Sequence, residues 1–253
     1  MNVKKWVTMA ALAAVTLAMP LAAFAVPVGL ELQLLVDVSG SIDAAEFTLQ
    51  QTGYVNAFKS AAVQNAITAN PTGSIAVQLI YWSGGAQQSI AVPWTLVTAA
   101  TASAFGDAIA AVARPFSGLT APGSAINFGA PLFGTNSFDA PRQVMDVSGD
   151  GAANDGASTS AARDAALAAG VDTINGIIIL GESGLATFYT DNVIGGTAPF
   201  LLSASGFDTF STAIQDKLER EIIKTPFPAS ILLMGVGLLG MGALARRRRA
   251  ACR

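Results

Sequence analysis

Short apolar runs alternate with segments of helical spacing along most of this chain, and this alternation limits the folds that it can adopt. Strands are expected at four apolar runs, 31–38, 75–82, 143–147 and 173–180. Helices are expected between and after them, at 43–62, 103–112, 124–132, 157–169 and 207–222. Such alternation is typical of a parallel sheet with helices on both faces. We therefore predict an α/β fold with a doubly wound, mostly parallel sheet.

Local signals refine this expectation. The run 89–92 is bounded by Gly84-Gly85 and Pro93, so it should be one antiparallel edge strand that ends at the proline. Asp43 and Glu46 have the spacing of a capping box, and Ser103 could cap the next helix. A final group of charged side chains in the last helix is predicted to face solvent: Lys217, Glu219, Arg220 and Glu221.

Composition excludes several functions. All 17 acidic residues but only seven of the 14 basic ones lie between residues 26 and 225. An acidic body argues against nucleic acid as a partner, because phosphates require basic surfaces. The chain has no histidine, and its one cysteine is Cys252. A Ser-His-Asp triad, a Cys-His pair and a histidine zinc site are therefore excluded.

Both ends of the chain read as targeting segments. Residues 1–25 are predicted to be a signal peptide, since Lys4 and Lys5 precede an apolar stretch and Ala23-Phe24-Ala25 fits a cleavage site. The body would occupy residues 30–223. In the tail, 226–253, an apolar run of 17 residues precedes four arginines, and as a helix it would span about 25 Å. This tail could therefore anchor the protein, with its arginines in the cytoplasm.

The tail also resembles the bacterial PEP-CTERM sorting signal, although Pro226-Phe227-Pro228 stands where Pro-Glu-Pro is expected. That resemblance implies processing by a sorting protease of the exosortase type, followed by release or attachment at the cell surface. The alternative is a permanent single transmembrane anchor. In either case we expect an exported bacterial protein of the envelope, cell surface or extracellular matrix.

Oxygen-bearing side chains follow two of the predicted strands. Asp37, Ser39 and Ser41 come at the end of the first strand, and Asp150 follows the strand at 143–147. Ligands of open parallel sheets bind beyond the carboxyl ends of the strands. Hard cations such as Mg²⁺ take oxygen ligands of this kind. The alternative for Asp37-x-Ser39-x-Ser41 is an ordinary turn, in which Asp, Ser and Gly are favoured.

Read together with the loop 118–126, these residues resemble the von Willebrand factor type A domain and its metal-ion-dependent adhesion site. The resemblance covers nearly the whole body and implies the Rossmann-like fold of that family. It also implies that Asp37, Ser39 and Ser41 form the first metal-binding loop, with Thr120 supplying a hydroxyl and Asp150 a carboxylate. Ser124 is the alternative to Thr120, because it also stands beside an Ala-Ile pair.

Three polar residues near this site have other possible roles. Asp146 lies inside an apolar strand, where it could orient the metal loop or be satisfied by backbone donors. Asn154 and Asp155 are expected to form the following turn and helix cap rather than to bind metal.

The function implied by the resemblance is metal-dependent binding rather than catalysis. We expect a bound Mg²⁺, with Mn²⁺ or Ca²⁺ as alternatives, that captures an acidic group of a protein or glycan partner. Two other classes remain: a metal-dependent hydrolase using Asp37 or Asp150, and a structural envelope or matrix protein whose site is vestigial. The absence of histidine and of a second acidic pair argues against the hydrolase.

Overall fold

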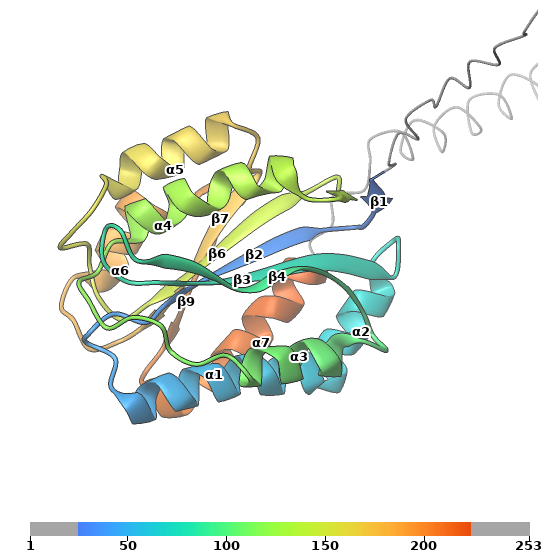
Figure 1. Ribbon diagram of the computed structural model, residues 1–253, viewed down its shortest axis with the longest axis horizontal. Coiled ribbons are helices and arrows are strands. Elements are labelled where there is room, and N and C mark those ends of the chain that lie inside the picture. Colours follow the sequence, from blue (N-terminus) through green and yellow to red (C-terminus); the bar gives the residue numbers. More distant parts are fainter. Residues whose placement is uncertain (1–24, 224–253) are drawn as a thin grey trace, which may run out of the picture.

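The computed structural model describes residues 25–223 (Figure 1). The predicted tail, and all of the predicted signal peptide except its last residue, lie outside the described residues. Within the described range, no helix is both long enough and apolar enough to cross a membrane.

A mostly parallel sheet forms the centre of the molecule. Its strand order is β4-β3-β2-β6-β7-β8, and β9 also pairs with β7. The strands β3, β2, β6, β7 and β9 are parallel to their neighbours, whereas β4 and β8 join the two ends of the sheet in antiparallel pairing. The strand bounds are Glu31–Asp37 (β2), Ser74–Trp82 (β3), Gln88–Thr98 (β4), Gln143–Gly149 (β6), Thr173–Ile179 (β7), Gly195–Gly196 (β8) and Leu201–Ala204 (β9). A separate short ladder pairs β1 (Val26–Pro27) with β5 (Phe138–Asp139).

Helices cover both faces of this sheet, which confirms the predicted fold class (Figure 1). One face carries α1 (Ala44–Lys59), α2 (Ala61–Ala69), α3 (Ala102–Ala110) and α7 (Phe207–Ile223). The other carries α4 (Pro122–Gly129), α5 (Thr159–Ala168) and α6 (Leu185–Phe188), with a 3₁₀ turn at Ala130–Thr135 and a π turn at Tyr189–Val193. The central strands β2, β3 and β7 are buried along their whole length, as expected for strands covered on both faces.

Several helix starts differ from the prediction. The capping box of Asp43 and Glu46 is confirmed at the start of α1. The predicted helix 43–62 is divided at Ser60, whose hydroxyl accepts a bond from Val63 N and caps α2. Ser103 does not cap α3, which begins one residue earlier, at Ala102, with Thr101 in the N-cap position. The helix predicted at 124–132 begins at Pro122, because proline suits the first helical turn, where its missing N–H is not needed.

The prediction that Pro93 ends the edge strand is wrong. β4 continues through it to Thr98. The pairing of β4 with β3 passes from Val92 opposite Leu79 to Thr95 opposite Val77, so Pro93 and Trp94 lie in an irregular, bulged part of the ladder. A proline is tolerated there because the bulge and the outer edge do not require its missing N–H.

The prediction that Lys217 and Glu221 face solvent is also wrong. Both side chains are buried on the inner face of α7, together with Ile214, Leu218 and Ile222. Their burial is possible because Lys217 forms ion pairs with Glu221 and with Asp146 of β6.

Candidate metal-binding site

The predicted site residues lie at the carboxyl end of two neighbouring strands. β2 ends at Asp37 and β6 at Gly149, and the two strands pair in parallel with Val36 opposite Ser148. The loops that follow therefore start side by side. This register is what brings Asp150 to the loop that carries Ser39 and Ser41.

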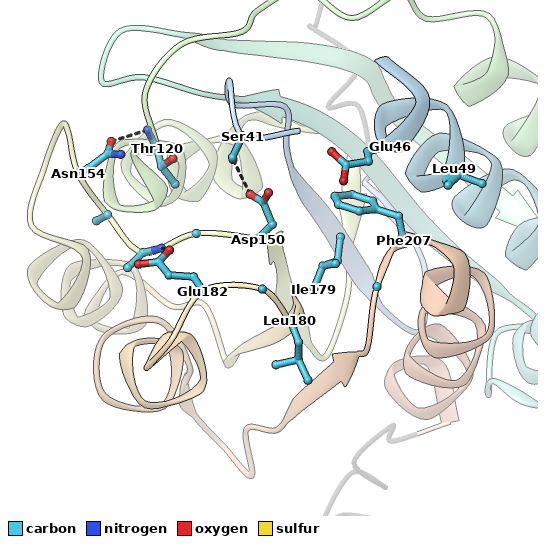
Figure 2. Close-up of a pocket in the computed structure, with 15 residues that line it drawn as sticks. Ser41, Glu46, Leu49, Thr120, Asp150, Asn154, Ile179, Leu180, Glu182 and Phe207 are labelled. Carbon is cyan, nitrogen blue, oxygen red and sulfur yellow. Dashed lines mark hydrogen bonds between the residues drawn. The ribbon is translucent and has the colours of Figure 1, made fainter. Parts of the chain in front are cut away.

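A chain of hydrogen bonds joins these residues. The backbone N–H of Ser39 donates to Oδ1 of Asp37 at 2.7 Å. The hydroxyl oxygens of Ser39 and Ser41 are 3.1 Å apart, and Ser41 Oγ donates to Oδ1 of Asp150 at 2.8 Å (Figure 2). The two loops thus present one continuous group of oxygen atoms.

Thr120 joins this group from a third loop, just before α4. It lines the same pocket as Ser41 and Asp150 (Figure 2). Its backbone N–H donates to Oδ1 of Asn154 at 2.8 Å, and its carbonyl accepts from Asn154 N at 3.0 Å. Asn154 therefore fixes the position of the Thr120 loop.

Ser124, the alternative to Thr120, has a different contact. Its hydroxyl accepts a hydrogen bond from Ala157 N at 3.0 Å, and it is not part of the pocket lining. Asp155 also ties loops together, since its Oδ2 accepts from Gly85 N at 2.7 Å. The cap of α5 expected from Asn154 and Asp155 is supplied by Ser158 instead.

Two residues that the sequence did not single out hold the first loop in place. The guanidinium of Arg114 donates to the carbonyls of Val38 and Ser39, at 2.9 and 2.7 Å. The amide of Gln50 donates to the carbonyl of Asp37 at 2.8 Å. All three acceptors are backbone groups, which every residue carries, so no sequence pattern could have indicated these contacts.

The donor set fits a divalent cation. Asp37 is fully buried, and its Oδ2 has no hydrogen-bond partner among the described residues. Burial raises the pKa of Asp37 to about 7, opposed by the Ser39 N–H and reinforced by repulsion from Asp150. A buried carboxylate oxygen without a donor is expected to be paired with a cation. The surrounding ligands are carboxylates and hydroxyls, the oxygen donors that hard cations prefer.

Clusters of metal-binding side chains are otherwise lacking in residues 25–223. No group of three or more His, Cys, Asp or Glu side chains in that range could hold a metal ion. The site described here has only two carboxylates, so it depends on the hydroxyls of Ser39, Ser41 and Thr120.

Gly149 allows the site to be this compact. A Cβ atom at this position would overlap the hydroxyl of Tyr189 and would lie 3.0 Å from Oδ2 of Asp37. The Tyr189 hydroxyl is buried and, like Asp37 Oδ2, has no hydrogen-bond partner among the described residues. Burial, then the nearby Asp37 and Asp150, raise the pKa of Tyr189 well above its ordinary value.

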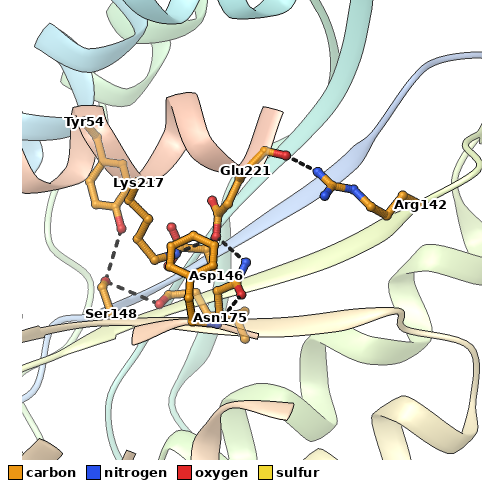
Figure 3. Close-up of polar contacts among 9 residues, drawn as sticks. Tyr54, Arg142, Asp146, Ser148, Asn175, Lys217 and Glu221 are labelled. Carbon is orange, nitrogen blue, oxygen red and sulfur yellow. Dashed lines mark hydrogen bonds and ion pairs between the residues drawn. The ribbon is translucent and has the colours of Figure 1, made fainter. Parts of the chain in front are cut away.

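A buried charged cluster lies behind the site, between β6, β7 and α7 (Figure 3). Nζ of Lys217 is 2.5 Å from Oδ1 of Asp146 and 2.6 Å from Oε1 of Glu221. Asn175 also donates to Glu221, at 2.8 Å. Asp146 is therefore paired with a lysine rather than satisfied by backbone donors, and its carboxylate forms no hydrogen bond with the metal-binding loops among the described residues.

The site opens into a pocket of about 680 Å³. Ser41, Thr120 and Asp150 lie along it, and Glu46, Glu182 and Phe207 contribute further side chains (Figure 2). The site is therefore accessible to a partner from solvent.

Comparisons with known proteins agree with this architecture. Residues 27–226 match the model of a family described as "Protein of unknown function (DUF1194)". No curated protein sequence matches the chain. Similar solved structures include von Willebrand factor type A from Catenulispora acidiphila (14% identity, TM-score 0.54, covering 77% of this chain and 43% of that one).

Two further similar structures are those of a mussel byssus protein and a pilus adhesin. Proximal thread matrix protein 1 of the mussel byssus, with a zinc-occupied MIDAS motif, is 15% identical (TM-score 0.56, 77% of this chain, 46% of that chain). The pilus adhesin SpaC of Lactobacillus rhamnosus GG is 15% identical (TM-score 0.56, 78% of this chain, 31% of that chain). The chain spans less than half the length of each of these proteins. The likeness shows that the fold is of the von Willebrand A type.

Proposed function

We propose that this chain, which belongs to the family described as "Protein of unknown function (DUF1194)", is a metal-dependent binding module. Asp37, Ser39, Ser41, Thr120 and Asp150 would hold a divalent cation at the carboxyl end of the sheet. A carboxylate of a partner would then take the position that faces the pocket. The observation that carries this proposal is the buried Oδ2 of Asp37, which has no hydrogen-bond donor among the described residues.

The ligand types favour capture of an acidic group. Two carboxylates balance the charge of a divalent ion, and the neutral hydroxyls add no further charge. When bound, the ion would supply an electrophilic contact for an incoming oxygen. The zinc-occupied MIDAS of the mussel protein supports divalent-metal binding, and the SpaC pilus adhesin supports an adhesive role. We propose Mg²⁺ as the resident ion, with Mn²⁺ and Ca²⁺ as alternatives.

We place this activity outside the cell. The chain would be exported by its signal peptide and kept at the envelope, or released, through its tail. Membrane anchoring by that tail and exosortase processing concern residues outside the described range. They are proposed from the sequence alone.

We propose a binding role rather than an enzymatic one. Nothing among the pocket-lining residues supplies a histidine or cysteine for acid-base or nucleophilic work. A metal-dependent hydrolase and a structural protein with a vestigial site are the competing functions. Turnover of a phosphate ester that disappears in Asp37→Asn would favour the hydrolase.

Calorimetric titration tests the proposal directly. Purified protein, stripped with EDTA and dialysed, is titrated with Mg²⁺, Mn²⁺ and Ca²⁺ at pH 7.5. We expect saturable binding of one ion, and its loss in Asp37→Asn, which keeps the size of the side chain. No heat of binding and no thermal shift with any of the three ions would overturn the proposal.

A further inference from the structure

Two carboxylates flank the proposed metal site within its pocket. Glu46 comes from the first turn of α1, and Glu182 from the loop after β7. Figure 2 shows them on opposite sides of Asp150.

Each of these carboxylates is held by one hydrogen bond. Oε2 of Glu46 accepts from Asp43 N at 2.8 Å, and Oε2 of Glu182 accepts from Ala152 N at 2.8 Å. Within residues 25–223, neither Glu46 nor Glu182 forms an ion pair. No lysine or arginine of the described range lines the pocket. Both carboxylates are therefore oriented, and neither has a cationic partner within residues 25–223.

An apolar wall completes the pocket. Leu49 and Leu180, which are 45% and 46% exposed, line it together with Phe207. Long basic side chains bury their aliphatic stems on such surfaces and keep the charged end near an acceptor. The wall and the two carboxylates thus match the two parts of a lysine or arginine side chain.

The balance of charge in the pocket also favours a ligand with a lysine or arginine side chain. The carboxylates of Asp37, Asp150, Glu46 and Glu182 outweigh the two charges of a divalent cation. A ligand that brings only another carboxylate would enter a pocket of like charge. A ligand that also brings a cation would be attracted, and complementarity of this kind determines which partner binds.

We propose that this pocket binds a polypeptide segment with a lysine or arginine close to the carboxylate that reaches the metal. The inference rests on the proposed function and narrows its partner to a protein. The basic group would pair with Glu46 or Glu182 beside the metal site, with its stem on the apolar residues that line the pocket. An acidic polysaccharide without cationic groups would be repelled by the same carboxylates.

Matched peptides test this proposal on the full chain at saturating Mg²⁺. Three capped, fluorescently labelled peptides of equal length carry Arg with Asp, Gln with Asp, or Arg with Asn, and a uronic acid oligosaccharide serves as the glycan probe. We expect the Arg-Asp peptide to bind at least about tenfold more tightly than the other probes, by fluorescence anisotropy.

Charge-neutralised variants locate the effect. Glu46→Gln with Glu182→Gln keeps an oxygen acceptor at both positions, and it should reduce the preference for Arg over Gln to less than about threefold. Asp216→Asn with Glu219→Gln removes the same charge from α7, outside the pocket, and should retain the preference. Equal binding of the Arg and Gln peptides, no peptide binding, tighter oligosaccharide binding, or an unaltered preference in the first variant would each overturn the inference. If calorimetry shows that Mg²⁺ does not bind, the proposed function itself is wrong. If Mg²⁺ binds but the Arg-Asp peptide is not preferred, only the present inference is wrong.

Discussion

Ser41 Oγ donates a hydrogen bond of 2.8 Å to Oδ1 of Asp150, a residue 109 positions further along the chain. This bond joins the loops that follow β2 and β6. The protein's own contacts therefore set the spacing between the first metal-binding loop and the second carboxylate. Preorganised ligands reduce the entropy that binding would otherwise cost.

Removing each of the two candidate hydroxyls in turn should show which of them binds the metal and which has a structural role. We expect Thr120→Ala to weaken Mg²⁺ binding about tenfold or more, because it removes an oxygen from the site. Ser124→Ala should leave Mg²⁺ affinity within about twofold and lower the free energy of unfolding by about 1 kcal/mol, since Ala157 N loses its acceptor. Calorimetry and urea denaturation measure the two effects. The opposite pattern would make Ser124 the ligand.

Stability of the metal-free protein should fall as the pH rises from about 4 to about 7. Burial raises the pKa of Asp37 to about 7 and, despite Lys217, also raises the pKa of Asp146, whereas the ordinary value is 3.8. The folded protein then holds protons that the unfolded chain has released, so the stability present below pH 4 is lost as these groups ionise.

Urea denaturation in EDTA at pH 5 and pH 7.5 checks this expectation. We expect a free energy of unfolding lower at pH 7.5 by on the order of 1 kcal/mol or more. Asp37→Asn should reduce the difference, and Mg²⁺ at pH 7.5 should restore stability to the wild-type protein. Equal or greater stability of the metal-free protein at pH 7.5 would contradict the prediction.

Much of the fold and of the site could be predicted from the sequence because both depend on short-range patterns. The alternation of apolar runs with helical spacing implied the parallel sheet. In such a sheet an aspartate at the end of a strand, such as Asp37, must lie at the ligand-binding edge. The sequence offers both Thr120 and Ser124 as the hydroxyl ligand, and the structure places Thr120, but not Ser124, along the pocket.

Other features depend on contacts between distant segments. Lys217 and Glu221 share the apolar stripe of α7 with Ile214 and Leu218, and this spacing was the available signal. Their charge favoured an outward prediction, since buried charges are rare unless paired. The pairing partner, Asp146, is on another element. Asp146 itself, a carboxylate inside an apolar strand, was the second signal that a buried cationic partner exists.

Removing the cation of the buried cluster should be strongly destabilising. In Lys217→Met, the carboxylates of Asp146 and Glu221 would lose their shared cation, at a cost of about 3–5 kcal/mol. Adding Asp146→Asn should recover part of this loss. Asp216 is an exposed residue on the same helix, and Asp216→Asn should alter stability by less than about 0.5 kcal/mol. Chemical denaturation of the wild type and the three variants measures these effects. Equal free energies of unfolding for Lys217→Met and Asp216→Asn would refute the role of Lys217 as the shared cation.

A methyl group at position 149 should disturb the packing of Tyr189 and Asp37 at the proposed metal site. Gly149→Ala would press against the hydroxyl of Tyr189 and Oδ2 of Asp37, so we expect a loss of about 1–3 kcal/mol in stability together with weaker Mg²⁺ binding. Adding Tyr189→Phe removes one of the two overlaps and should recover a large share of the stability. Gly134→Ala is the matched control, because a Cβ there meets no atom within 4 Å. Thermal denaturation that ranks the two alanine variants equally would show that the predicted crowding is absent.

The bulge at Pro93 affects the tendency of this protein to aggregate at high concentration. β4 is a terminal strand of the sheet, eleven residues long, with Ile90 and Leu96 more than 40% exposed. A regular strand of that kind would be a template for pairing with another molecule, and hence for aggregation. Pro93 removes a hydrogen-bond donor near the middle of this edge, and the irregular register bends it. The same residue that made the strand look short in the sequence thus protects a disulfide-free body from forming intermolecular β-sheets.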